Sequence, residues 1–444
     1  GYTLNTEQSI CEVNDVEDLE TEIVYENGYL YVNKLSHKGT KCTAYFDLIP
    51  DDQAPTVNIA TSSSDDTSVT VTANASDNIG IYYYYFQLDE GEEIRSEENA
   101  YTFNGLEKDS VHTITVRVVD AAGNEASVTD EVTVGLRAKD VILAHYQTVL
   151  TRTDFSTTVT ATTTGTIYKS ANESQYDDFG EVYYFAGKPT DNWFYFGGYY
   201  WRIVRINGDG SIRLIYNGTS TSQKGNRTMI NTDQAFNSSY GHNIFVGYMY
   251  QDGQTTNSNI KTTVDNWYLS NLADEAEYLD GNAGFCGDRT PYSGSGTGTS
   301  RTDYAAYDRL ENSKNPSFKC TDKDNDLYTT PGSSEGNGAL KVTPGDNDST
   351  ATPIGLITAD EVAFAGGVYG SRNTSYYLYN NAYYWTMSPY NYRSAGARVF
   401  AVNSSGYLND DYVYGTGGVR PVINLKSAIA ITGSGTTSDP FKVG

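Results

Sequence analysis

Residues 383–425, YYWTMSPYNYRSAGARVFAVNSSGYLNDDYVYGTGGVRPVINL, say more about this chain than any other stretch. Both ends are regular and partly apolar, with Trp385 near the start and Arg420-Pro421-Val422-Ile423-Asn424-Leu425 at the finish. Between them Tyr, Asn, Asp, Ser, Arg and Gly predominate, interrupted by short apolar anchors: Val399, Phe400, Val402, Leu408 and Val413. Tyrosine gives rigid contact area, arginine anchors through hydrogen bonds, and the small polar residues adapt. The composition predicts a binding surface over Tyr390 to Thr416; an ordinary turn-rich β surface is the alternative.

Five residue types are missing from residues 390–424: Lys, Glu, Gln, Met and Trp. These are the residues that no codon ending in C can encode. Randomising the first two bases of an asparagine codon of the AAC type would give the alphabet that is found. The gap therefore suggests a segment whose codons have been varied in this way.

The composition predicts a β-rich chain of several domains. At 444 residues two to four domains are expected, and 39 Tyr and 15 Phe accompany abundant Thr, Val and Ile, which favour strands. The formal net charge is −26. Such a field repels phosphate backbones and anionic lipids, so we expect no nucleic-acid partner and no direct membrane contact. Its simplest role is to keep a surface protein soluble.

The four cysteines form two well-separated couples. With no C-x-x-C spacing and only four scattered histidines, a zinc site is poorly supported. We predict the disulfides Cys11–Cys42 and Cys286–Cys320, and hence an extracellular location; four buried free thiols are the alternative. The sequence contains no apolar span of membrane length, and the abrupt start at Gly1 leads us to expect a cell-surface anchor in a segment upstream.

Turn signals predict four segments. Residues 1–52 would be a small β unit stapled by the first disulfide, with a hairpin around Asn27-Gly28. Residues 53–136 carry short alternating strands, as in an immunoglobulin-like sandwich that serves as a spacer. Residues 137–167 would be a helical linker, with a helix from Ala138 to Thr151 and a Thr-rich linker or extended strand after it.

Residues 168–444 are predicted to form the largest domain, of α+β type. It opens with a meander of strands, and a helix is predicted over 260–272 from the spacing of its apolar residues. A second helix should begin at Thr358, where Glu361 completes a capping box. Residues 280–350 read as a long loop stapled by the second disulfide.

Motifs for catalysis and metal binding are weak throughout. The scattered histidines argue against a Ser-His-Asp or Cys-His arrangement, and the Gly-rich residues 293–298 lack the lysine of a phosphate loop. Asp322, Asp324 and Asp326 have the spacing that begins a calcium loop, but later positions do not fit, so a solvated acidic loop is favoured. We therefore expect no enzyme activity, no cofactor and no metal, although the sequence alone leaves glycoside hydrolysis open.

Five segments resemble one known family: residues 191–193 (DNW), 200–210 (YWRIVRINGDG), 354–361 (IGLITADE), 383–389 (YYWTMSP) and 418–425 (GVRPVINL). Together they are similar to the variable proteins of bacterial diversity-generating retroelements, over the chain from residue 168 onward. In that family a reverse transcriptase copies a template with errors at adenines, and the copy replaces the gene's 3′ variable region. The resemblance implies a C-type lectin fold like that of the formylglycine-generating enzyme. Residues 76–81 and 119–124 resemble bacterial Ig-like modules.

The resemblance also implies a division between scaffold and ligand contacts. Trp385, Ser388, Arg420 and Asn424 would be scaffold. The variable, ligand-binding positions would be drawn from Tyr390, Asn391, Tyr392, Arg393, Ser394, Ala395, Gly396, Arg398, Ala401, Tyr407, Asn409, Asp410, Asp411, Tyr412, Tyr414, Gly415 and Thr416. Formylglycine formation is not implied, because no cysteine pair lies near this segment. Calcium-dependent sugar binding is not implied either, because no Glu-Pro-Asn type motif occurs.

Three functions compete at this point. We expect a receptor or adhesin head on a stalk, diversified by the retroelement, whose ligand is an unknown macromolecule, protein or glycan. The first alternative is a fixed-specificity, carbohydrate-binding, lectin-like adhesin. The second is a surface hydrolase or a structural pilus or S-layer component.

Overall fold

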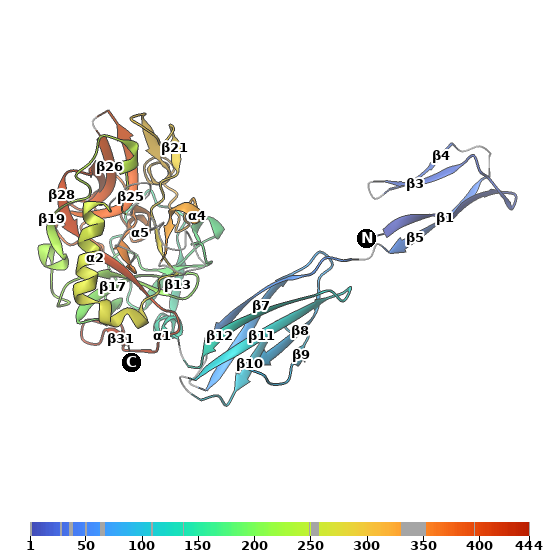
Figure 1. Cartoon of the computed structure of the whole chain (residues 1–444), viewed down its shortest axis with the longest axis horizontal. Helices are drawn as coiled ribbons and strands as arrows, with labels where there is room; N and C mark the ends of the chain where they lie inside the picture. Colours follow the sequence, from blue (N-terminus) through green and yellow to red (C-terminus); the bar gives the residue numbers. More distant parts are fainter. Residues whose placement is uncertain are drawn as a thin grey trace, which may run out of the picture. The chain divides into compact units, whose positions relative to one another are not determined.

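The computed structural model describes residues 2–26, 29–34, 39–48, 51–62, 67–107, 110–135, 137–247, 249, 257–329, 352–394 and 396–443. The chain divides into two compact units, Gly1–Val134 and Gly135–Gly444, and strands predominate in both (Figure 1). Within the described residues, no helix is long and apolar enough to cross a membrane. The prediction of a β-rich chain with more than one domain is confirmed.

The first unit begins with a three-stranded sheet in the order β2-β1-β5, with a separate hairpin of β3 and β4. The bounds are β1 (Tyr2–Val13), β2 (Val16–Glu17), β3 (Glu22–Glu26), β4 (Tyr29–Asn33) and β5 (Lys41–Leu48). Cys11 and Cys42 are register partners and form the predicted disulfide. Leu30 and Val32 are exposed, so this small piece has little core and the disulfide is its main staple. The predicted turn residues Asn27 and Gly28 lie outside the described part of the chain.

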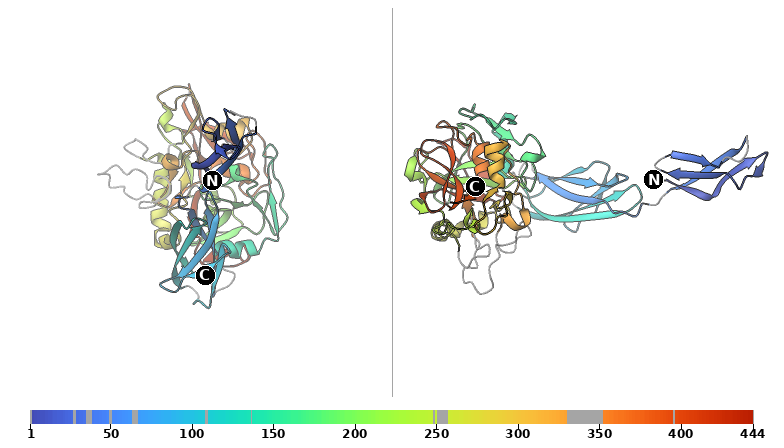
Figure 2. Two further views of the ribbon diagram at one scale, coloured as in Figure 1. Left: turned by 90° about the vertical axis from the view of Figure 1, so that its right-hand side faces the viewer. Right: turned by 90° about the horizontal axis from the view of Figure 1, so that it is seen from above.

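Two sheets with a shared apolar core form the rest of the first unit (Figure 2). One has the order β10-β7-β6, and the other has the order β12-β11-β8-β9. Val71, Phe86 and Val116 come from both sheets and are fully buried, as the alternation of a sandwich requires. The predicted sandwich is thus found over β6 (Thr56–Ser62), β7 (Ser68–Ser76), β8 (Ile81–Leu88), β9 (Ile94–Ser96), β10 (Ala100–Asn104), β11 (Val111–Asp120) and β12 (Glu125–Thr133).

The predicted linker over residues 137–167 is wrong, because this segment belongs to the second unit. Helix α1 (Ala138–Ala144) buries Ala138 and Ile142 in the core of that unit. The helix does not reach Thr151, because the chain continues as strand β13 (Thr148–Thr151), which pairs in parallel with β14 (Thr166–Lys169). β-Branched residues in this stretch favour the strand. The expected boundary near residue 136 therefore falls at Val134.

The larger sheet of the second unit contains ten strands. Its main path is β13-β14-β15-β17-β16-β31-β30, while β18 joins β17 to β29, and β24 pairs with β29. The bounds are β15 (Tyr183–Tyr184), β16 (Trp193–Phe196), β17 (Tyr199–Ile206), β18 (Ile212–Tyr216), β24 (Ile354–Leu356), β29 (Pro421–Leu425), β30 (Ile431–Thr432) and β31 (Phe441–Val443). Helix α2 (Asn259–Asn271), predicted from its periodicity, contacts β24 and buries Ile260 and Val264.

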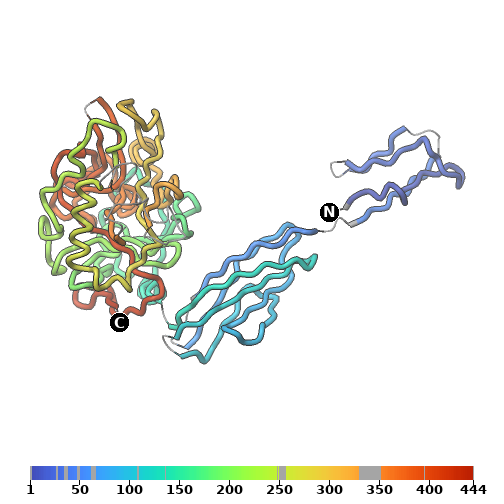
Figure 3. Tube along the Cα trace, in the orientation of Figure 1, coloured from blue at the N-terminus to red at the C-terminus, as the bar shows by residue number. Residues whose placement is uncertain are grey.

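A seven-stranded sheet carries the C-terminal segment singled out by the sequence. Its path is β19-β28-β25-β22-β21, with β26 on β25 and β27 on β26. In Figure 3 residues 384–419 are traced in orange-red, and the golden residues 291–304 lie beside them, where β22 pairs with β25. The bounds are β19 (Asn231–Ala235), β21 (Pro291–Ser293), β22 (Thr302–Tyr304), β25 (Tyr384–Arg393), β26 (Gly396–Val402), β27 (Leu408–Tyr412) and β28 (Thr416–Val419).

The predicted loop over 280–350 is partly ordered where it is described. Besides β21 and β22 it contains a two-stranded sheet of β20 (Phe285–Cys286) and β23 (Leu327–Tyr328), and helix α4 (Lys323–Asp326). The predicted disulfide Cys286–Cys320 is present. Residues 330–351 lie outside the described part of the chain.

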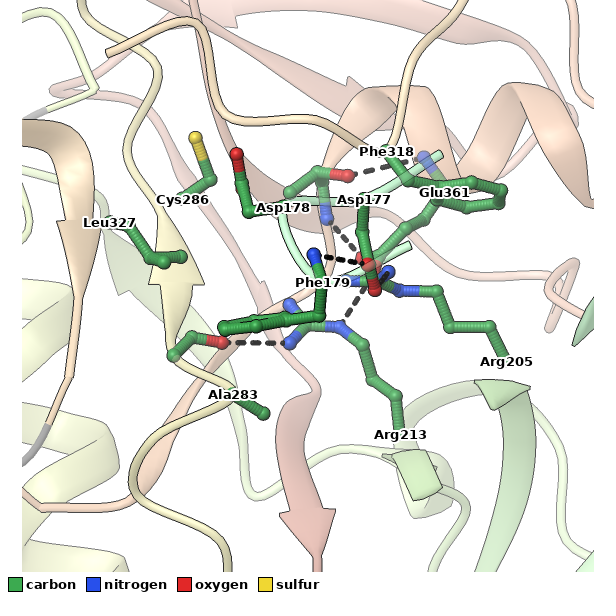
Figure 4. Close-up of a pocket in the computed structure, with 12 residues that line it drawn as sticks. Asp177, Asp178, Phe179, Arg205, Arg213, Ala283, Cys286, Phe318, Leu327 and Glu361 are labelled. Atoms are coloured by element: carbon green, nitrogen blue, oxygen red, sulfur yellow. Dashed lines mark hydrogen bonds and ion pairs between the residues drawn. The ribbon is translucent and has the colours of Figure 1, made fainter. Parts of the chain in front are cut away.

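A cluster of buried charged residues connects several elements of the second unit (Figure 4). Helix α5 (Ala359–Phe364) begins with the predicted capping box of Thr358 and Glu361. The Glu361 carboxylate lies 3.0 Å from Arg205 Nε and 2.5 Å from Arg213 Nε, and Arg205 Nη1 lies 2.9 Å from Asp177 Oδ2. The cavity between these groups is about 20 Å³, which leaves room for about one water molecule. The cluster therefore joins β17, β18 and α5, and leaves no space for a substrate.

Candidate ligand-binding surface

The apolar anchors of the C-terminal segment are core residues. Val399, Phe400, Val402, Leu408 and Val413 are all fully buried. Strands β26 and β27 pair antiparallel, with Val399 opposite Asp411 and Val402 opposite Leu408. Along β27 the pleat directs Asn409 and Asp411 to solvent while Leu408 packs inward. The segment therefore combines a fixed interior with an outer polar face.

The predicted ligand-binding residues fall into three groups in the structure. Those that are exposed or half-buried form a set that we call the mutable face: Arg393, Ser394, Arg398, Tyr407, Asn409, Asp410, Asp411, Tyr412, Tyr414, Gly415 and Thr416. The buried group consists of Tyr390, Asn391, Tyr392, Gly396 and Ala401. Ala395 lies outside the described residues.

The prediction that the five buried residues contact a ligand is wrong, because they lie in the core beneath the surface. Strand β25 is central in its sheet, with β22, β26 and β28 as neighbours, so its side chains are covered on both faces. Ala401 is 1% exposed on the adjacent strand. Gly396 has a φ of +132°, and a Cβ there would lie 2.9 Å from Cδ2 of Tyr240. Glycine is required at that turn by backbone and space together.

Three tyrosines form an aromatic row: Tyr412 and Tyr414 of the mutable face, and Tyr240 beside them. The ring of Tyr414 lies 4.5 Å from that of Tyr240 and 5.2 Å from that of Tyr412. The guanidinium of Arg398 lies 4.1 Å above the Tyr412 ring. Tyr240 and Tyr414 are 45% and 46% exposed, so the row offers rigid aromatic area to a partner. We call Tyr240, Tyr414 and Tyr412 the tyrosine row.

A partly buried hydrogen-bond network supports the mutable face. The Tyr390 hydroxyl donates to Glu311 at 2.6 Å, and the Tyr369 hydroxyl donates to Asp410 at 2.8 Å. The two hydroxyl oxygens lie 2.8 Å apart. Burial, with nearby carboxylates, raises the pKa of Tyr369 and Tyr390 well above the usual value of tyrosine, so both remain protonated donors.

Arginines fix the outer positions of the face. Arg398 Nη1 donates to Asp410 Oδ2 at 2.9 Å, and Arg393 Nη2 donates to Asp303 Oδ1 at 2.8 Å. The hydrogen bonds of Arg398 to Asp410 and to the Tyr412 hydroxyl raise the pKa of its guanidinium although burial opposes them. These pairs hold long side chains in one geometry before any ligand arrives.

Sequence reasoning missed the residues that complete the face from elsewhere in the chain. Tyr240, Asp303, Glu311 and Tyr369 are remote in sequence from the segment that they support. Tyr240 is held by its backbone, because its carbonyl accepts from Ala397 N at 2.9 Å. No pattern in the sequence predicts such partners, because they contact the segment only in the folded structure.

Asn391 is a buried amide without a partner. Its side chain is 1% exposed, and neither Oδ1 nor Nδ2 has a hydrogen-bond partner among the described residues. Such an orphan is rare in a fixed core, because desolvating an unpaired amide costs stability. Packing does not explain an asparagine here.

A Ser-His-Asp chain does occur, in the first unit, although the sequence argued against one. Ser110 Oγ lies 2.8 Å from His112 Nε2, and His112 Nδ1 lies 2.8 Å from Asp89 Oδ2. The hydroxyl, however, has one proton, and it donates to the Glu107 carbonyl at 2.5 Å. Asp89 also accepts from Thr113 N, and its carboxylate is half exposed. These hydrogen bonds hold the start of strand β11 in place and do not activate the serine as a nucleophile.

Three carboxylates could hold a cation. Oxygen atoms of Asp51, Asp77 and Asp120 lie within 4.8 Å of one another in the first unit, and such ligands suit Ca²⁺. Protein donors already occupy much of this cluster, because Asp120 accepts from Ala122 N and Asn124 N, each at 2.8 Å. The expectation of no metal stays a prediction.

The acidic residues 322–326 are not a solvated loop throughout. Asp322 caps helix α4, and Asp326 is only 8% exposed, with Oδ2 accepting from Arg289 N at 2.6 Å. Burial raises the pKa of Asp326 to about 7. The aspartate spacing therefore reflects a capped helical turn.

No family model matches the chain, and no curated protein matches it. Among solved structures, the PKD1 domain of Vibrio anguillarum Epp is 23% identical, with 19% of this chain and 99% of that chain covered and a TM-score of 0.17. Chitinase ChiA74 from Bacillus thuringiensis is 18% identical, with 44% and 21% covered and a TM-score of 0.20. Domains d3–d4 of rat CD45 are 17% identical, with 27% and 72% covered and a TM-score of 0.18. We draw no function from likenesses at these scores.

Proposed function

We propose that this chain is a bacterial cell-surface receptor or adhesin of the retroelement-diversified type. Its C-terminal unit, of C-type lectin fold, would present the mutable face to a macromolecular ligand. The upstream β units would serve as a spacer. The two disulfides agree with an oxidising, extracellular setting.

The observation that carries the proposal is the separation between interior and surface within one short segment. The five apolar anchors are fully buried, whereas Asn409, Asp411 and Tyr414 are exposed a few residues away. Exposed positions on such a framework can change with little effect on folding. A diversified binding protein needs this separation, because each new sequence must still fold.

The orphaned Asn391 supports the same proposal. An asparagine codon of the AAC type is the substrate of adenine mutagenesis, so asparagine is expected even where packing gives it no hydrogen bond. Gly396 would be fixed, because a Cβ there would lie too close to Tyr240, and Ala401 would be fixed as a core residue that is 1% exposed.

A fixed-specificity lectin is the first alternative, and a surface hydrolase or a pilus-like structural component is the second. The tyrosine row would suit a glycan as well as a protein. The Ser110–His112–Asp89 chain is the feature that a hydrolase would use, but its serine proton is directed away from the histidine.

Sequencing this gene from many clonal isolates tests the proposal. We expect substitutions to concentrate at the mutable face and at Asn391, with the five anchors, Trp385 and Arg420 constant. An invariant gene would favour the fixed lectin. Substitutions spread evenly over face and anchors would contradict diversification by a targeted mechanism.

A further inference from the structure

The second unit contains a cavity of about 630 Å³, within the size range of small-molecule sites. It is lined by residues of three chain segments, 188–202, 217–228 and 374–381, together with Thr437. None of the described residues of the mutable face lines it. Whatever this cavity binds is therefore separate from the proposed variable surface.

The charge of the cavity opposes the charge of the protein. Among the described residues, its lining includes Lys188, Arg202 and Lys224 but no aspartate or glutamate. The chain as a whole has 56 acidic and 30 basic residues, so an acid-free, cationic lining runs against its composition. Both lysines are exposed, and neither ammonium has a hydrogen bond or ion pair to a described residue. The cavity is thus an electropositive site on an acidic protein.

Arg202 is a buried cation without a paired carboxylate. It is 7% exposed, and its guanidinium donates from Nε and Nη2 to the neutral oxygens of Asn192 and Pro189. Nη1 has no hydrogen bond to any described residue. The negative charge of Asp191 acts on the Arg202 guanidinium only from beyond ion-pair distance. The positive charge of the buried Arg420 repels the same guanidinium. A buried, uncompensated guanidinium is costly, and an anion in the cavity would relieve that cost.

The remaining lining suits a ligand that carries several hydroxyl groups. Asn217 and Asn381 line the cavity, and each side-chain oxygen already accepts a hydrogen bond from the protein, whereas neither Nδ2 has a hydrogen bond to a described residue. These two amide groups can therefore donate to sugar hydroxyls. Tyr377 also lines the cavity, but its hydroxyl oxygen is itself buried and so is not open to a ligand. Trp193 and Tyr377 supply aromatic walls beside Arg202, whose guanidinium lies 4.2 Å and 5.2 Å from their rings. The lining thus joins a carboxylate site to polar and aromatic groups.

We propose that this cavity is a constant binding site for an acidic sugar, a saccharide unit that carries a carboxylate. The carboxylate would meet Arg202 Nη1 and the two lysines, and the sugar hydroxyls would meet the amide nitrogens of Asn217 and Asn381. The site would hold a glycan irrespective of the sequence of the mutable face. The protein would then have one invariant and one variable point of contact.

Matched sugars test this inference on the full chain. Isothermal titration calorimetry would compare the methyl glycosides of glucuronic acid, galacturonic acid and N-acetylneuraminic acid with methyl glucoside and methyl galactoside, and sodium acetate would be the competitor. We expect at least one acidic sugar to bind about tenfold more tightly than the neutral sugars, and acetate to compete poorly. Equal binding of acidic and neutral sugars, no binding of any acidic sugar, or full competition by acetate would each overturn the proposal.

Two variants keep the test independent of folding. Lys188→Gln combined with Lys224→Gln alters only exposed lysines and should weaken acidic-sugar binding about tenfold. Asn381→Gly removes an exposed amide of the lining at a residue with a φ of +63°, which glycine adopts easily, so it should weaken the binding of the same sugars while the protein stays folded. Lys426→Gln, another exposed lysine that does not line the cavity, is the control and should change nothing. Unchanged affinity in both cavity variants would place the sugar elsewhere.

Discussion

The ring centroids of Tyr240 and Tyr414 lie 4.5 Å apart. Tyr414 belongs to the turn between β27 and β28, whereas Tyr240 comes from the segment after β19, outside the variable stretch. The Tyr240 carbonyl also accepts from Ala397 N on β26, so the backbone at Tyr240 is tied to the stretch from residue 390 to 416. The proposed binding surface is therefore shared between the proposed variable positions and a residue outside them.

Substitutions at the exposed positions of the mutable face should leave stability nearly unchanged. Tyr414→Ser and Asn409→Ala should each change the free energy of unfolding by no more than about 0.5 kcal/mol, because both side chains are exposed. Leu408→Ala, next to Asn409 but fully buried, should cost about 2–5 kcal/mol. Urea denaturation followed by circular dichroism measures all three. A large cost for Asn409→Ala would show that the face is part of the core.

Asn391 and Asn424 form a matched pair of buried asparagines. Asn391→Leu should be neutral or stabilising, because the amide makes no hydrogen bond to a described residue. Asn424 accepts from Asn207 Nδ2 at 3.3 Å and donates to the Gly284 carbonyl at 3.3 Å, so Asn424→Leu should cost at least about 1–3 kcal/mol. Melting temperatures of the two variants give the comparison. Equal losses would mean that Asn391 has a structural role after all.

Glu361 should be among the most sensitive positions in the second unit. Its carboxylate pairs with Arg205 and Arg213 and caps helix α5. Arg205 keeps Asp177 as a partner in Glu361→Gln, but the buried Arg213 guanidinium loses its carboxylate, so the substitution should cost about 3–5 kcal/mol. The same substitution at the exposed Glu277 is the control, with an expected change below about 0.5 kcal/mol. Chemical denaturation measures both free energies of unfolding. A small effect of Glu361→Gln would contradict the structural role that we assign to this cluster of charges.

Asp326 should make stability depend on pH in a stated direction. Burial raises the pKa of this carboxyl to about 7 in the folded state, whereas an unfolded aspartate titrates near about 3.9. The folded state therefore holds the proton more tightly, and the stabilisation present below the unfolded pKa is lost as pH rises through 7. Asp326→Asn stays neutral and keeps an acceptor for Arg289 N. Relative to the wild type, this variant should gain more than about 1 kcal/mol in unfolding free energy between pH 4.5 and 8. If the difference in unfolding free energy between the variant and the wild type is the same at pH 4.5 and at pH 8, Asp326 is not protonated at neutral pH.

Local signals in the sequence predicted the local features of the fold. The capping box at Thr358, the helix over 260–272 and both disulfide pairings are confirmed, because each depends on residues close in sequence or on cysteine number alone. The segment 137–167 was misread, because Thr-rich polar residues resemble a linker until their strand partner is known.

The sequence predicted which segment forms the candidate surface, but not which of its side chains are buried. The apolar anchors were correctly separated from the polar positions, since alternation along a strand is visible in sequence. The burial of Tyr390 and Tyr392 was not, because it depends on β25 being central in its sheet. The partners Tyr240 and Tyr369 join the face only through tertiary packing.

The neighbouring DNA tests the central claim most directly. Codon-by-codon comparison of the region encoding residues 383–425 with the adjacent genome should reveal a near-repeat beside a reverse transcriptase gene. The differences should fall only at template adenines, in codons of the mutable face and Asn391, and spare the codons of Val399, Phe400, Val402, Leu408 and Val413. Absence of such a repeat, or differences at all four bases and in the anchor codons, would contradict diversification of this surface.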